Sequence, residues 1–226
     1  MLVLTALALG QPDLSGTWDL ALDVATLANV SFLGTTTIVS HQWMVAEVRR
    51  EGDGYVVTHD TCGLTAETRP ALAQTRFPQA FVDAIPDKTY PLELSTVEGR
   101  TRAYMDLRPL AIGFDPQQAT VLPQAIDAPG VTDWDGDGKA AATIHLLVPI
   151  FGTIEVYQVQ TATAVLDGWV RGNDEISGGA EIRDLQQRTL GASNRIFVQN
   201  PALRNDPAGS SFRMTRTTPG ARCRSG

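Results

Sequence analysis

Apolar and polar residues alternate with a period of two along most of this chain, a pattern typical of strands with one buried and one exposed face. Residues 101–108 alternate in this way. Residues 143–150 and 154–157 repeat the pattern on either side of Gly152, so they predict a hairpin. Residues 43–49 and 55–60 predict a second one across a turn rich in glycine. Further strands are expected at 16–22, 34–40, 161–170, 176–184, 195–199 and 211–217.

About ten strands separated by turn residues predict an all-β fold rather than a βαβ sheet. We expect an antiparallel β-barrel of about 8–10 strands, with a β-sandwich as the alternative. Helical periodicity is nearly absent. One short helix is expected at residues 78–85, where Pro78 suits the first turn and Phe81, Val82 and Ile85 form an apolar stripe.

The chain has 226 residues, of which 43% are hydrophobic and 19% charged, so we expect a globular protein rather than a disordered one. A single β-barrel domain is predicted over residues 11–226. Residues 1–10 are interpreted as the remnant of a signal peptide or a disordered N-terminus, because residues 1–9 are apolar and end in small side chains. A buried N-terminal strand is the alternative.

A formal net charge of -7 disfavours binding to nucleic acid or to anionic lipid, because both partners require a basic surface. No apolar run reaches the roughly 18–20 residues that a membrane-spanning helix needs. Cys62 and Cys223 fit an exported protein with one disulfide, although two unpaired thiols are the alternative. We therefore expect a monomer that is secreted or lies in the periplasm or cell envelope of a Gram-negative bacterium.

The most specific motif is the acidic run at residues 133–139. Asp133, Asp135 and Asp137 occupy the first, third and fifth positions of a calcium loop, Gly138 gives the sharp turn, and the Lys139 carbonyl is the next expected ligand. Three like charges this close repel one another unless a cation lies among them. The sequence therefore predicts a structural Ca²⁺ site, with a solvated acidic turn as the alternative.

The later positions of a full calcium loop are not acidic here. Ala141 and Ile144 stand at the ninth and twelfth positions, where an EF-hand carries its last ligands. We expect weak binding unless a distant acid such as Asp127 completes the site. The run is similar to the Asp-x-Asp-Gly-Asp-Gly loops of calcium-binding β-repeat and extracellular modules, and this resemblance implies an ion that fixes a loop beside a strand.

The two ends of the chain carry a second signal. Gly16-Thr17-Trp18 opens the first expected strand, and residues 212–216 read Phe-Arg-Met-Thr-Arg. Together they resemble lipocalin-like barrels (calycin-like ends). The resemblance implies that Arg213 packs as a cation over Trp18, and that Cys62 and Cys223 tie a mid-barrel strand to the tail. In the alternative, Trp18 is an ordinary core aromatic and Arg213 a surface charge.

If a barrel forms, its inward side chains are apolar, and they either pack solid or line a cavity for a small apolar ligand. The expected lining residues are Trp18, Leu20, Met44, Val48, Ala103, Met105, Leu146, Val148, Phe212 and Met214.

Catalytic signatures are missing from the sequence. His41, His59 and His145 lie far apart without metal-ligand spacing, and the chain has no nucleophile elbow, phosphate loop or dinucleotide fingerprint. We therefore expect no enzymatic activity. The first hypothesis is an exported barrel that binds a small apolar ligand and carries a structural calcium loop. The alternative is a calcium-stabilised structural or adhesion module of the cell envelope without an internal ligand. The whole chain also resembles exported proteins of Gram-negative bacteria, and this likeness supplies no activity that could be carried over to it.

Overall fold

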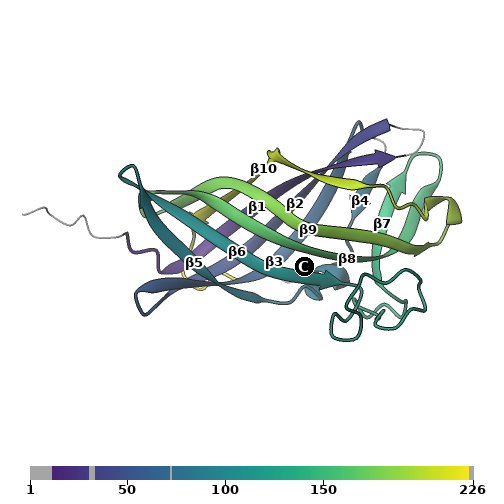
Figure 1. Cartoon of the computed structure of the whole chain (residues 1–226), viewed down its shortest axis with the longest axis horizontal. Coiled ribbons are helices and arrows are strands. Elements are labelled where there is room, and N and C mark those ends of the chain that lie inside the picture. The colour runs from purple at the N-terminus through teal and green to yellow at the C-terminus, as the bar shows by residue number, and fades with distance from the viewer. Residues whose placement is uncertain (1–11, 31–33, 72, 224–226) are drawn as a thin grey trace, which may run out of the picture.

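The computed structural model describes residues 12–30, 34–71 and 73–223, and these ranges form one antiparallel sheet (Figure 1). The predicted segment at residues 1–10 lies outside the described residues. No helix among those described is long and apolar enough to cross a membrane. The ten strands are β1 (Gly16–Val30), β2 (Gly34–Glu51), β3 (Gly54–Arg69), β4 (Gln74–Arg76), β5 (Lys88–Val97), β6 (Arg100–Ile112), β7 (Ala142–Val148), β8 (Gly152–Arg171), β9 (Glu175–Ala192) and β10 (Leu203–Arg216).

The sheet closes into a ring, so the prediction of an antiparallel barrel is confirmed. Eight strands follow one another in the order β2-β1-β10-β9-β8-β6-β5-β3, and β3 pairs again with β2. Figure 1 shows β5 near one end of the barrel and β7 near the other. At the β7 end, β4 and β7 pair with each other and lie between β3 and β8. They take the place that β5 and β6 hold at the opposite end.

Both predicted hairpins are present, as β2–β3 and β7–β8. The predicted helix is α1 (Gln79–Asp83), whose Phe81 is buried. The predicted strand at residues 195–199 is wrong, because Arg195–Phe197 is a 3-10 helix and the Asn194 side chain accepts a hydrogen bond from the Ile196 backbone N–H. Two strands are present that the alternation did not predict: β4 has only three residues, and Pro91 weakens the strand signal of β5.

The interior contains two apolar clusters. The larger cluster lies in the β5 half of the barrel. It contains Ala103 and seven other predicted lining residues: Trp18, Leu20, Met44, Val48, Met105, Phe212 and Met214. The second cluster gathers Phe81 and Ile85 from the α1 region with residues of β6, β7 and β8, and the predicted lining residues Leu146 and Val148 are partly buried against it. None of the seven predicted lining residues named in the larger cluster is more than 3% exposed. These side chains therefore form a packed core.

Arg216, rather than Arg213, lies over the Trp18 ring, so that prediction is corrected. The Arg216 guanidinium carbon is 4.7 Å from the ring centroid, and Trp18 and Arg216 are direct cross-strand partners. Arg213 has the opposite parity on β10, pairs with Ala21 and is 65% exposed, at 3.8 Å from a Glu175 carboxylate oxygen. Since successive residues of a strand face opposite sides, Arg213 cannot reach the end of the core where Trp18 lies.

The Arg216 side chain also joins β10 to two other segments at this end of the barrel, the residues before β1 and the turn between β8 and β9. It donates hydrogen bonds to the backbone carbonyls of Asp13, Ser15 and Asn173 at 2.6–3.1 Å. Gly16 makes this approach possible, because a Cβ there would lie 2.7 Å from an Arg216 nitrogen.

Replacing Arg216 by methionine should lower the free energy of unfolding by about 2 kcal/mol, because charge-assisted hydrogen bonds and a cation–π contact are lost. Chemical denaturation followed by intrinsic fluorescence measures the change. The matched control is Arg213→Met on the same strand, which should stay within about 0.5 kcal/mol of the parent protein. Equal losses of unfolding free energy in the two variants would show that the contacts of Arg216 do not stabilise this end of the barrel.

Candidate metal site

The segment between β6 and β7, residues 113–141, is anchored at several points rather than loose. It lies outside the strands at the β7 end of the barrel (Figure 1). Phe114 and Leu122 pack with Val159 of β8 in a small apolar cluster. Gly113 permits close contact, because a Cβ there would lie 2.4 Å from the Gln158 carbonyl oxygen. Backbone hydrogen bonds such as Asp115 N–H to the Gly130 oxygen, at 2.8 Å, fix the path.

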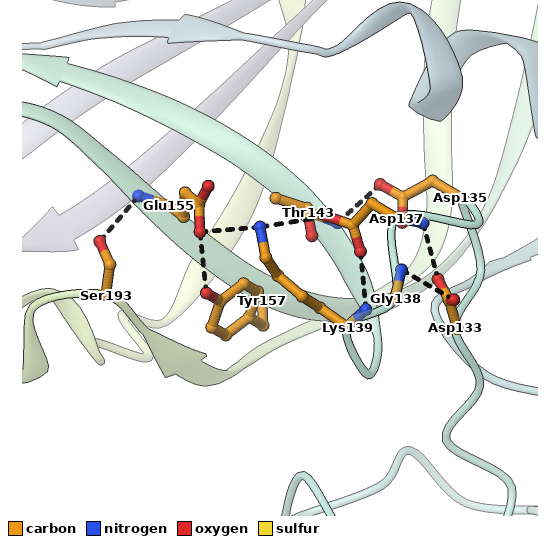
Figure 2. Close-up of polar contacts among 9 residues, drawn as sticks. All are labelled: Asp133, Asp135, Asp137, Gly138, Lys139, Thr143, Glu155, Tyr157 and Ser193. Atoms are coloured by element: carbon orange, nitrogen blue, oxygen red, sulfur yellow. Dashed lines mark hydrogen bonds and ion pairs between the residues drawn. The ribbon is translucent and has the colours of Figure 1, made fainter.

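This segment brings the three predicted aspartates together. One carboxylate oxygen from each of Asp133, Asp135 and Asp137 lies within 4.8 Å of the others (Figure 2). The Asp133 carboxylate accepts the backbone N–H groups of Asp137 at 3.1 Å and of Gly138 at 3.0 Å. Gly138 has a φ of 83°, which favours glycine at this turn. The group can therefore hold a metal ion on its oxygen atoms.

Asp135 is the member of the group that most needs a cation. The residue is only 8% exposed, and its Oδ2 accepts the Thr143 backbone N–H at 3.0 Å. Its Oδ1 is buried and has no hydrogen-bond partner among the described residues. Burial, and then the neighbouring charges of Asp137 and Asp133, raise the pKa of the Asp135 carboxyl above its ordinary value. A buried carboxylate oxygen without a donor is costly, and a bound cation removes that cost.

The later loop positions do not add ligands. Ala141 is fully buried and pairs with Asp133 as an isolated bridge, and Ile144 belongs to the second apolar cluster. Asp127, which the sequence suggested as a completing acid, is not part of the group found among the described residues. A cation here would be held by the three carboxylates, the Lys139 carbonyl proposed from the sequence, and water.

An ion-pair network beside the aspartates was missed by the sequence analysis. The Lys139 ammonium lies 2.9 Å from Glu155 Oε2 on β8 and 3.4 Å from Asp137 Oδ2 (Figure 2). The Tyr157 hydroxyl donates to the same Glu155 oxygen at 2.9 Å. The hydrogen bond from Lys139, and then that from Tyr157, lower the pKa of the Glu155 carboxyl. Only the β7–β8 hairpin brings Glu155 to the loop, so no local motif could have revealed it.

The disulfide between Cys62 and Cys223 is confirmed. Cys62 occupies an irregularity of β3, between the cross-strand pairs that Gly63 and Thr61 make with β2. The tail after β10 returns to β1, where Thr217 N–H donates to the Thr17 carbonyl. The tail then passes β2 and reaches β3, so the disulfide holds the tail across β1, β2 and β3.

Fold and site together define an antiparallel β-barrel with one disulfide and an acidic loop that can hold a metal ion. No protein-family model matches this chain, and neither the curated proteins nor the solved structures contain a match.

Proposed function

We propose that this protein is a calcium-stabilised structural module of the bacterial cell envelope, with one Ca²⁺ bound by Asp133, Asp135 and Asp137. The buried Asp135 Oδ1, which has no partner among the described residues, carries the proposal. Without a cation, the fold would bury a carboxylate oxygen beside two further carboxylates. With a cation, the same oxygen becomes a ligand.

Calcium is favoured because every candidate ligand is a hard oxygen atom. Zinc prefers His and Cys ligands, and the group contains neither. Magnesium demands near-ideal octahedral geometry, whereas calcium accepts six to eight oxygen ligands in flexible arrangements. The glycine-rich turn of residues 133–139 matches the first half of a calcium loop, in which carboxylates also accept backbone N–H groups.

A structural role fits the contacts of the loop. Asp135 bonds to the backbone of Thr143 at the start of β7. Trp134 lies between two of the proposed ligands and packs edge-on against Phe81 of α1, with 5.1 Å between ring centroids. A cation in the loop would therefore connect β7 and α1 at the end of the barrel where β4 and β7 replace β5 and β6. The disulfide supports a location outside the reducing cytosol.

The burial of the core puts this role ahead of ligand binding in the barrel. Trp18, Met105 and Met214 have no exposed surface, and the other predicted lining residues of the larger cluster have almost none. Close-packed side chains leave no space beside them for an apolar molecule in this half of the barrel, where most of the predicted lining residues lie.

Saturating calcium should raise the free energy of unfolding by about 2.7 kcal/mol at 100 times the dissociation constant. Thermal and urea denaturation in Ca²⁺, in Mg²⁺ and in chelator measure the gain. Asp135→Asn should abolish it without lowering the stability of the metal-free protein, because the amide removes a buried charge.

The control is Asp53→Asn, a change of the same charge at the exposed turn between β2 and β3, where asparagine is equally suited. This variant should keep the full calcium gain. Identical denaturation curves in chelator and in about 10 mM Ca²⁺, roughly ten times the weakest dissociation constants of extracellular sites, would refute the proposal.

A further inference from the structure

Lys139 places a positive charge at the edge of the acidic group. Its ammonium is 3.4 Å from Asp137 Oδ2, and Asp137 is one of the three carboxylates that would hold the metal. The same ammonium is closer to Glu155, at 2.9 Å, and lies 5.8 Å from the centre of the Tyr157 ring. Its side chain is 38% exposed, so it is free to shift toward either carboxylate.

Glu155 is held firmly on β8. Its backbone N–H donates to the Ser193 hydroxyl at 3.0 Å, and its carbonyl accepts the Ser193 N–H at 2.9 Å. Its carboxylate receives the Tyr157 hydroxyl as well as Lys139 (Figure 2). The carboxylate is therefore a fixed acceptor at the side of Lys139 away from the aspartates.

Resting on the proposed function, we infer that Lys139 is a built-in competitor of the metal ion and that Glu155 is the positioning residue that holds it away from the aspartates. When a cation binds, repulsion favours the placement of the ammonium on Glu155. When the Glu155 carboxylate is replaced by an uncharged amide, the ammonium pairs with Asp137 instead and opposes binding. The pair sets the cation affinity of the loop although neither side chain is a ligand.

The size of the effect follows from Coulomb's law. A unit charge about 5 Å from a divalent ion at a hydrated surface changes its binding by roughly tenfold. Loss of the Lys139 charge should strengthen Ca²⁺ binding by about that factor. Loss of the Glu155 charge should weaken binding both directly and through the released ammonium, and only the second part requires Lys139.

A double-mutant cycle separates the two parts. The four proteins are the parent, Lys139→Met, Glu155→Gln and the double variant, and methionine leaves the Lys139 carbonyl in place. Calcium affinity is measured from the dependence of the melting temperature on Ca²⁺ concentration and from competition with Tb³⁺, whose luminescence Trp134 can excite. Glu181→Gln is the matched control, because Glu181 forms an exposed ion pair with Arg183 at 2.9 Å on β9.

We expect Lys139→Met to bind Ca²⁺ about tenfold more tightly and Glu155→Gln about tenfold more weakly. Once Lys139 is absent, Glu155→Gln should cost no more than about threefold, the part due to direct attraction. Glu181→Gln should match the parent.

Equal effects of Glu155→Gln with and without Lys139 would overturn the inference, because Glu155 would then act on the metal alone. Weaker binding by Lys139→Met would overturn it as well. Both results leave the calcium site intact and so differ from failure of the proposed function, in which none of the four proteins binds Ca²⁺.

Discussion

Serine at both Cys62 and Cys223 is expected to lower the free energy of unfolding by about 5 kcal/mol in urea denaturation, the largest effect of any substitution considered for this chain. The cysteines are 161 positions apart, and cross-linking so long a loop strongly restricts the unfolded chain. The folded state loses less, because the tail keeps its backbone bond from Thr217 to Thr17.

The reduced parent protein is the matched comparison for this variant. Reducing agent should bring the parent to the stability of Cys62→Ser/Cys223→Ser and leave the double variant unchanged. A loss below about 1 kcal/mol in the variant would contradict the chain-entropy argument. It would mean that the unfolded chain keeps residual structure, which the disulfide does not restrict further.

A buried histidine should make the barrel sensitive to mild acid. His59 is 4% exposed, and its Nδ1 lies 2.9 Å from the Tyr90 hydroxyl. Burial, with a smaller contribution from the Lys88 charge, lowers the pKa of His59 from 6.5 to about 4. Between these pH values the unfolded chain takes up a proton that the folded chain does not. Stability contributed by neutral His59 is therefore complete above about pH 6.5 and is lost as the pH falls toward 4.

The loss should reach about 3 kcal/mol at pH 4, since each unit of pKa difference corresponds to about 1.4 kcal/mol. His59→Gln keeps a polar group near Tyr90 and removes the titration. The slope of the unfolding free energy against pH measures how many protons the chain takes up on unfolding. Between pH 4 and 6.5 this number should be smaller by about one in His59→Gln than in the parent.

Because replacing a buried side chain also changes the overall stability, the pH slope is the decisive measurement for His59→Gln. The parent protein, measured over the same pH range, is the control. A parent slope in His59→Gln would show that carboxyl groups alone cause the acid sensitivity.

The sequence predicted the class of fold because alternation is a local property. Residues that alternate along β6 and β7 can bury one face only as strands, whatever their partners are. The acidic run could also be recognised locally, since the calcium-loop spacing lies within seven residues.

Pairing between distant strands could not be predicted in the same way. The likeness to lipocalins placed Arg213 over Trp18, yet the register of β10 on β1 gives that place to Arg216. Neither residue carries a local sign of its partner. Between β3 and β8, the barrel contains β5 and β6 at one end and β4 and β7 at the other. This arrangement likewise depends on which parts of β3 and β8 pair with each of these strands.

By itself, then, the sequence determined an all-β chain with alternating strands, two hairpins, a short helix and an acidic loop that could hold a metal ion. Tertiary structure alone decided that Asp135 is buried, that Glu155 meets Lys139, that His59 lies against Tyr90 and that the core is packed. Strand alternation and loop spacing are set by neighbours in the chain. Burial and charge pairing are set by neighbours in space, and those exist only after the sheet has closed.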